Sequence, residues 1–102
     1  MVLHYMGPKG LCTILNVDYK KQTVNIENKT NQMLYRAFGV NENPTWNDYE
    51  AFLRSRCFPE TRDYLKLALK AVGLNFYEPL NIIRKTQGRM AEDHQWIEFV
   101  ED

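Results

Sequence analysis

The stretch TWNDYEAFLRSRCFPETRDYLKLALKAVGL, residues 45–74, carries the strongest helix signals in the chain and sets its fold class. Thr45 follows a proline and precedes Asp48 by three positions, a spacing close to a capping box. A first helix is therefore predicted over about residues 46–57. Pro59 either ends this helix or opens the next one, because proline is tolerated only in the first turn of a helix.

Two further helices are predicted after the first. The second begins at Pro59 and Glu60, because YLKLALKAV is strongly helix-forming and Gly73 supplies a left-handed residue for its end. The third, over about residues 79–86, has a proline at its first position and ends before Gly88.

Outside this region the pattern is that of strands. Leu11–Asp18 and Thr23–Asn28 are rich in β-branched and apolar residues and predict an antiparallel hairpin. Met33–Val40 fits a third strand or a tucked loop, and His94–Val100 fits a strand that returns to the hairpin. The expected fold class is α+β in one domain, residues 1–102, with an N-terminal antiparallel β-hairpin, three short helices and a C-terminal strand in the sheet.

The composition gives no sign of export or membrane insertion. The N-terminus lacks a basic segment followed by an apolar run, and no window approaches the ~18 apolar residues of a membrane span. Cys12 and Cys57 form no CxxC pair, so neither a disulfide framework nor a zinc site is indicated. We expect a cytoplasmic protein with reduced thiols and no membrane partner.

Charge is balanced in total but uneven along the chain. There are 13 Lys plus Arg and 13 Asp plus Glu. Residues 54–89 hold eight basic and three acidic side chains, a net of +5, whereas residues 90–102 hold five acidic side chains and no Lys or Arg. Neutralisation of one segment by the other is the simplest interpretation. The alternative is a basic surface for an anionic partner and an acidic tail for a basic one.

Helix geometry singles out Arg56. Each residue advances 100° around the axis, so with Tyr49 at zero, Phe52 lies at about 300°, Leu53 at about 40° and Arg56 at about 340°. Arg56 thus falls inside the apolar arc, where an unpaired charge is costly. We expect it to pair with Asp93 or another acid of the C-terminal segment. The alternative is that its stem reaches water from the last helical turn.

The second predicted helix is apolar over a wide arc. One stripe contains Leu65, Ala68, Leu69 and Val72, and another contains Tyr64, Leu67 and Ala71. Such a helix is either central to the fold, which we favour in so small a domain, or presents one face to a partner.

Arg62 is expected in the first turn of that helix, where it opposes the helix dipole. A nearby acid such as Glu60, Asp63 or Asp93 would relieve this, and an anion bound at the helix start is the alternative.

No catalytic, metal or cofactor motif is apparent. His4 and His94 lack ligand spacing, Ser55 has no acyl-transfer context, and the glycines form no phosphate loop. Cys57 is expected to be a packed thiol. We therefore expect a non-catalytic protein without a cofactor.

A set of positions within residues 45–97 carries a family resemblance. They are Phe52, Leu53, Arg56, Pro59, Arg62, Gly73, Leu74, Gly88, Asp93, Trp96 and Ile97. With them, this half of the chain resembles small stand-alone proteins of Firmicutes encoded beside HipA-like serine/threonine kinases, in systems related to toxin–antitoxin modules. The chain has no HRD-like catalytic loop or DFG-like triplet, so the resemblance implies an accessory that binds another protein rather than the kinase itself.

Three functions remain open on the sequence. The first is a cytoplasmic protein-interaction module, antitoxin-like or kinase-associated. The second is a phage or mobile-element inhibitor, such as an anti-CRISPR protein, whose acidic tail imitates nucleic acid. The third is a DNA-binding helical module, against which zero net charge argues. The candidate partner-binding residues are Arg54, Tyr64, Lys66, Leu67, Lys70, Arg84, Lys85 and Arg89, and the candidate internal ion-pair residues are Arg56, Arg62 and Asp93.

Overall fold

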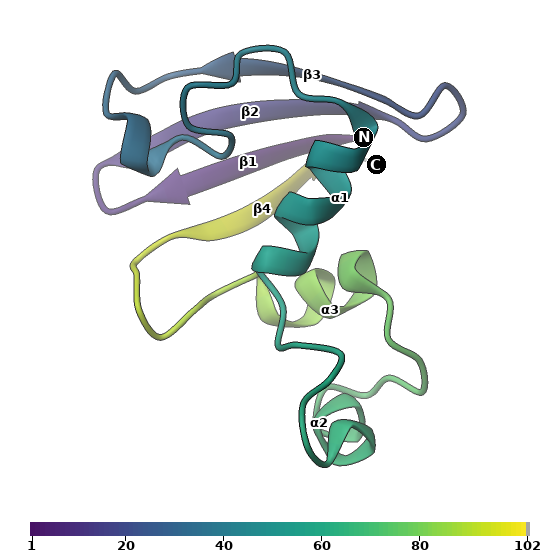
Figure 1. Ribbon diagram of the computed structural model, residues 1–102. Coiled ribbons are helices and arrows are strands. Elements are labelled where there is room, and N and C mark those ends of the chain that lie inside the picture. The colour runs from purple at the N-terminus through teal and green to yellow at the C-terminus, as the bar shows by residue number, and fades with distance from the viewer. Residues whose placement is uncertain (102) are drawn as a thin grey trace.

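Four strands form one antiparallel sheet in the order β3-β2-β1-β4, and the α-helices follow one another between β3 and β4 (Figure 1). The structure is a computed structural model that describes residues 1–101. The strands are β1 (Val2–Gly7), β2 (Gly10–Asp18), β3 (Thr23–Asn28) and β4 (Trp96–Glu101). The helices are the short 3₁₀ helix η1 (Met33–Tyr35), α1 (Trp46–Ser55), α2 (Leu65–Ala71) and α3 (Pro79–Thr86). The fold class is α+β, as predicted.

The predicted hairpin is present as β2 and β3. Leu15 pairs with Ile26 and Val17 with Val24, so the apolar residues of the two strands share one face. In the turn, the Asp18 carboxylate accepts hydrogen bonds from the backbone N–H groups of Lys20 and Lys21 at 3.0 and 3.1 Å. The alternation of the sequence is therefore a reliable guide to this part of the sheet.

Strand β1 was not predicted, and it is one of the two inner strands of the sheet. Leu3 and Tyr5 are buried, whereas Val2 and Met6 on the opposite face are half-buried. Both faces of β1 thus carry apolar residues, which hides the usual alternation. The C-terminal strand joins the sheet as expected, but it pairs with β1, with Tyr5 opposite Ile97, and not with a strand of the predicted hairpin.

Helix α1 begins as its capping box predicts. The Thr45 hydroxyl accepts from the Asp48 N–H at 3.2 Å, and the Asp48 carboxylate accepts from the Thr45 N–H at 2.9 Å. The helix packs Tyr49, Phe52 and Leu53 into the core, with the Phe52 ring edge-on to Tyr5 at a centroid distance of 5.0 Å. It ends at Ser55, two residues earlier than expected. Arg56 is therefore the residue that directly follows the helix.

Residues 33–40 form a loop and not a strand, so the second of the two interpretations given for this segment is confirmed. After η1 the chain continues in turns, and the backbone N–H of Ala37 donates to the buried Thr13 hydroxyl at 3.1 Å. This bond ties the loop to β2. Helix α3 has the predicted bounds, with Ile82 and Ile83 fully buried.

The second helix differs from its prediction in both position and role. It begins at Leu65, because residues 58–64 run through turns in which the Arg62 N–H donates to the Pro59 carbonyl at 3.1 Å. It is also not central: Figure 1 shows α2 at the end of the molecule farthest from the sheet. Only Leu69 of its seven residues is buried, because α1 and α3 already fill the space against the sheet. No helix within the described residues is long and apolar enough to cross a bilayer.

Candidate functional site

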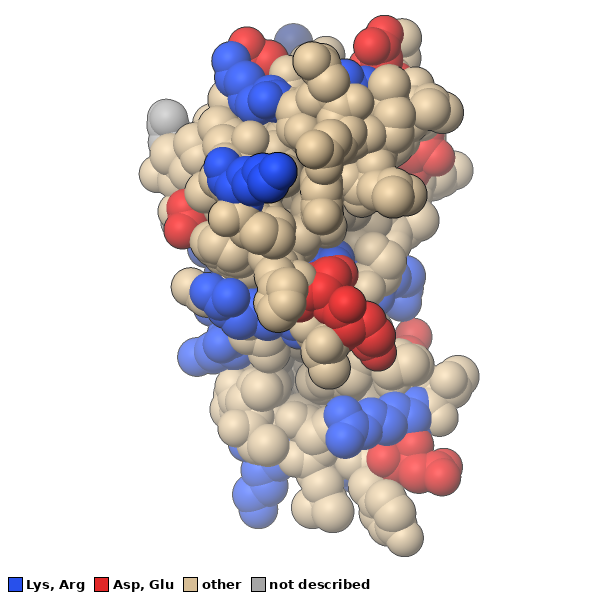
Figure 2. All heavy atoms as spheres, turned by 90° about the vertical axis from the view of Figure 1, so that its left-hand side faces the viewer, with Lys and Arg blue, Asp and Glu red and all other residues tan. Residues whose placement is uncertain are grey.

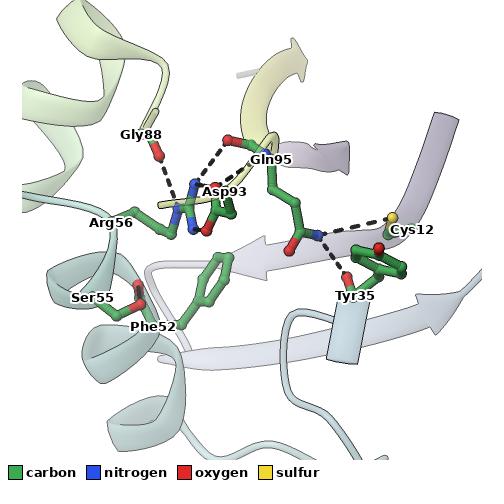
Figure 3. Close-up of polar contacts among 8 residues, drawn as sticks. All are labelled: Cys12, Tyr35, Phe52, Ser55, Arg56, Gly88, Asp93 and Gln95. Carbon is green, nitrogen blue, oxygen red and sulfur yellow. Dashed lines mark hydrogen bonds and ion pairs between the residues drawn. The ribbon is translucent and has the colours of Figure 1, made fainter. Parts of the chain in front are cut away.

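Within residues 45–97, the side chain of Arg56 makes more hydrogen bonds than any other. Only 6% of its surface is exposed, and its guanidinium donates four hydrogen bonds (Figure 3). Nε donates to the Gly88 carbonyl at 2.8 Å and Nη2 to the Gln95 carbonyl at 2.8 Å. Nη1 and Nη2 donate to the two carboxylate oxygens of Asp93 at 2.8 and 3.1 Å. The expected pair between Arg56 and Asp93 is present in the bidentate geometry that arginine favours.

Arg56, Gly88, Asp93 and Gln95, which we call the arginine cluster, join segments that are distant in sequence. Arg56 stands at the end of α1, and its partners belong to the loop between α3 and β4. The side chain of Gln95 extends the cluster, since its Nε2 donates to the Tyr35 carbonyl at 2.9 Å in η1. Gly88 has a φ of +64°, and a β-carbon there would lie 3.2 Å from the Arg56 β-carbon. A glycine is therefore needed where the loop crosses the arginine.

This arrangement explains Arg56 as a fold-stabilising residue and not as a ligand site. Four of the five N–H donors of a guanidinium have partners inside the protein, and the ring of Tyr5 lies 5.4 Å from its central carbon. The acidic C-terminal segment neutralises the basic one at this point. Asp102 and the side chain of Glu101, also counted in that acidic segment, lie outside the described residues.

The ion pair makes stability depend on pH in a specific direction. Hydrogen bonds from Arg56 lower the pKa of Asp93 below its ordinary value. A carboxylate with a lowered pKa in the folded state stabilises the fold above its unfolded-state pKa, and that stabilisation disappears as the pH falls through the folded-state pKa. We predict that the stability lost on changing Asp93→Asn is largest above about pH 5 and shrinks below about pH 4.

Urea unfolding of both proteins between pH 3 and pH 7 measures this difference. Asp63→Asn, at an exposed carboxylate in the turn before α2, is the control and should follow the wild type across the range. A difference in the free energy of unfolding between the wild type and Asp93→Asn that does not change with pH would contradict the assigned role of the pair.

Arg62 does not join an ion pair within the described residues, so its expected pairing with Glu60, Asp63 or Asp93 is wrong. It precedes α2 instead of lying in the first turn, and its guanidinium lies over the Phe58 ring at 5.6 Å. Glu60, one of its expected partners, pairs with Arg54 at 3.5 Å on the surface. Such an exposed pair contributes little to stability.

The basic residues of α3 and of the following loop contact the sheet. The guanidinium of Arg84 lies over the Phe99 ring at 4.4 Å, and that of Arg89 over the Trp96 ring at 4.7 Å. Lys85 is exposed beside them in sequence. Both rings belong to β4, far from α2, so the eight predicted partner-binding residues do not form one surface. Figure 2 shows blue and red side chains interspersed on the face it views, without a continuous basic area.

A second feature is the α2 lobe, by which we mean residues 58–78. Its inner side continues the hydrophobic core, with Leu69 buried and Phe58, Leu65 and Leu74 packed against that core, and the Tyr77 hydroxyl donates to the Phe58 carbonyl at 2.7 Å. Its outside carries three exposed large apolar side chains: Tyr64 is 81% exposed, Leu67 65% and Phe76 74%. Large exposed apolar side chains gathered on one lobe are typical of a surface that binds another protein. The two predicted residues Tyr64 and Leu67 both lie exposed on this lobe.

Tyr64 also has a strained backbone. Its φ of 59° and ψ of 37° place it in the left-handed region, which is costly for a residue with a bulky side chain. Gln87 is left-handed as well, but at the end of a helix, where this conformation closes the helix. Tyr64 stands before a helix, where extended backbone is usual, and makes no capping bond with its side chain. Strain without a visible local benefit marks a candidate functional residue.

Phe76 was missed as a candidate because it lies outside the predicted helices, where angular analysis does not apply. The signal that remains in the sequence is a large aromatic residue in a short loop between Gly73 and Pro79. Loop residues of this kind are exposed more often than helical ones, and they frequently carry function.

The remaining candidates for chemistry are unremarkable in their surroundings. Burial raises the pKa of Cys57 to about 11, so it remains a protonated, packed thiol at neutral pH, as expected. Among residues 1–101, no three His, Cys, Asp or Glu side chains are grouped so that they could hold a metal ion. Comparisons with models of protein families, with curated proteins and with solved structures found no match to this chain.

Proposed function

We propose that this chain is a small, non-catalytic, cytoplasmic module that binds another protein through the exposed side of the α2 lobe. The observation that carries the proposal is the exposure of Tyr64, Leu67 and Phe76 on a peripheral lobe. Tyrosine and phenylalanine are enriched in protein interfaces, and tyrosine is a frequent hot spot. The strained backbone of Tyr64 supports the same assignment, because the fold holds this ring in solvent at an energetic cost.

The resemblance to proteins encoded beside HipA-like kinases supports a regulatory accessory as the finer form of this proposal, with the kinase as partner. In that role the arginine cluster keeps the scaffold rigid, and the α2 lobe makes the contact. The positions that carry the resemblance include Arg56, Gly88 and Asp93, which all belong to the cluster. The resemblance therefore concerns the scaffold more than the proposed contact residues.

The two alternative functions receive less support from the geometry. An acidic tail that imitates nucleic acid would need its carboxylates in solvent; Asp93 is bonded to Arg56, which leaves Glu92 and Glu98 as the exposed acids among the described residues of that segment. A DNA-binding surface would need a continuous basic area, and Arg84 and Arg89 are engaged by aromatic rings of β4.

Site-specific photo-cross-linking in the native host tests the proposal. A benzophenone side chain replaces Tyr64 or Leu67 in two separate variants, and Leu34 of η1, which is 94% exposed, is the control position. We expect positions 64 and 67 to give the same adduct with another protein and position 34 to give none. Equal adduct yields at all three positions, or an adduct at position 34 alone, would overturn the proposal.

A further inference from the structure

We infer that the partner presents an acidic, amphipathic α-helix to α2. This inference rests on the proposed function and specifies the class of partner. Its starting point is the order of side chains around α2. With Lys66 at zero, Lys70 lies at about 40°, and Leu67 and Ala71 lie at about 100° and 140°. A basic strip and an apolar strip therefore run side by side along the solvent face, which we call the α2 face.

The basic strip is not neutralised within the described residues. Lys66 and Lys70 are exposed and have no ion pair there, and α2 contains no acidic residue. Two acids at the ends of the lobe are engaged elsewhere: Glu60 with Arg54 at 3.5 Å, and Glu78 with the Asn81 amide at 2.7 Å. Asp63 lies in the turn before the helix. An acidic edge on the partner would complement the two lysines.

The apolar strip indicates that the partner element is a helix. Leu67 and Ala71 are both exposed and stand four positions apart, which places them in one ridge along the helix surface, and the exposed Tyr64 stands just before the first turn. Ala71 is small and allows a second helix to approach closely at this end of the ridge. A helix with apolar residues at the same intervals, flanked by Asp or Glu, would match both strips.

A second copy of this chain does not offer such a helix. The apolar side chains of α1 are buried against the sheet, with Tyr49, Phe52 and Leu53 all inside the core. The exposed end of α3 carries Arg84 and Lys85, which would repel the lysines of α2. The complementary helix must therefore come from a different protein.

Synthetic peptides test the charge of the partner. The probe is a fluorescent 18-residue helical peptide with leucines spaced three and four positions apart and glutamates on both flanks, and the comparison peptide carries lysine at every glutamate. We expect the wild-type protein to bind the glutamate peptide about tenfold more tightly. The double variant Lys66→Glu/Lys70→Glu should invert this preference, whereas Lys20→Glu/Lys21→Glu, the same charge change in the β2–β3 turn, should keep it. Equal binding of the two peptides, or no binding of either, would overturn the inference.

Cross-linking at position 64 separates this inference from the proposed function. We expect the partner segment joined to position 64 to be an acidic helix, and the adduct yield to fall about tenfold in Lys66→Glu/Lys70→Glu. An adduct that is unaffected by charge reversal would overturn the acidic helix and leave the proposed function intact. An adduct between two copies of this chain, or binding of a single-stranded oligonucleotide that the charge reversal abolishes, would overturn both.

Discussion

Replacing Arg56 with methionine is expected to lower the free energy of unfolding by about 3 kcal/mol or more, because one partner of a buried ion pair is removed and the others stay behind. Methionine preserves much of the apolar stem but provides no donors. The Asp93 carboxylate would lose two hydrogen bonds, and the carbonyl groups of Gly88 and Gln95 would lose one each. In a domain of this size, the change corresponds to a melting temperature lower by about 12 °C or more.

Urea and thermal unfolding of matched variants measure the effect. Arg54→Met is the control, since it removes an arginine two positions earlier, in an exposed ion pair, and it should cost less than about 1 kcal/mol. Arg56→Lys should fall between the two, because an ammonium restores the charge without the planar fork that meets both Asp93 oxygens. Equal stabilities for Arg54→Met and Arg56→Met would contradict the central role of the cluster.

The double variant Arg56→Met/Asp93→Asn gives the energy of the pair itself. If most of the loss comes from leaving the Asp93 carboxylate without its partner, the double variant will be less destabilised than the sum of the single ones. Additive losses would instead place the main contribution of Arg56 in its bonds to the Gly88 and Gln95 carbonyls.

The sequence predicts those parts of the fold in which local chemistry and tertiary structure agree. The hairpin, the capping box of α1 and the proline start of α3 are local signals that tertiary packing did not override. Arg56 was predictable for a related reason, since helical angles placed it among core residues and the acidic segment followed in sequence. Its bonds to the Gly88 and Gln95 carbonyls were not predictable, because they depend on the path of a loop.

The errors have equally physical causes. Strand β1 has apolar residues on both faces, so its period was hidden. The second helix was extended back to Pro59 because its sequence has high helix propensity, whereas the chain needs turns at residues 58–64 to carry α2 away from the core. The expectation that α2 is central assumed that a wide apolar arc must be buried within the chain. The exposed Tyr64 and Leu67 show that part of that arc faces solvent.

Tyr64→Gly is expected to do two opposite things: to stabilise the isolated protein and to weaken binding of the cross-linked partner. Left-handed backbone costs a residue with a side chain about 1–2 kcal/mol, and glycine avoids this cost. Glycine loses about 0.5–1 kcal/mol through the greater freedom of the unfolded chain. Because the Tyr64 ring is mostly in solvent, little packing is lost, and a net gain of about 0.5–1 kcal/mol should remain.

Partner binding should weaken by about 30-fold or more in the same variant, which is the loss of about 2 kcal/mol that truncating a tyrosine hot spot brings. Tyr64→Ala is the matched control: it also removes the ring but keeps a β-carbon in left-handed backbone, so it should lose binding equally without the gain in stability. Binding measured with the purified partner and urea unfolding of the free variants separate the two effects. Unchanged binding in both variants would remove Tyr64 from the interface. A less stable Tyr64→Gly would mean that the ring packs within the lobe, and that the strain is balanced inside the chain and not by a partner.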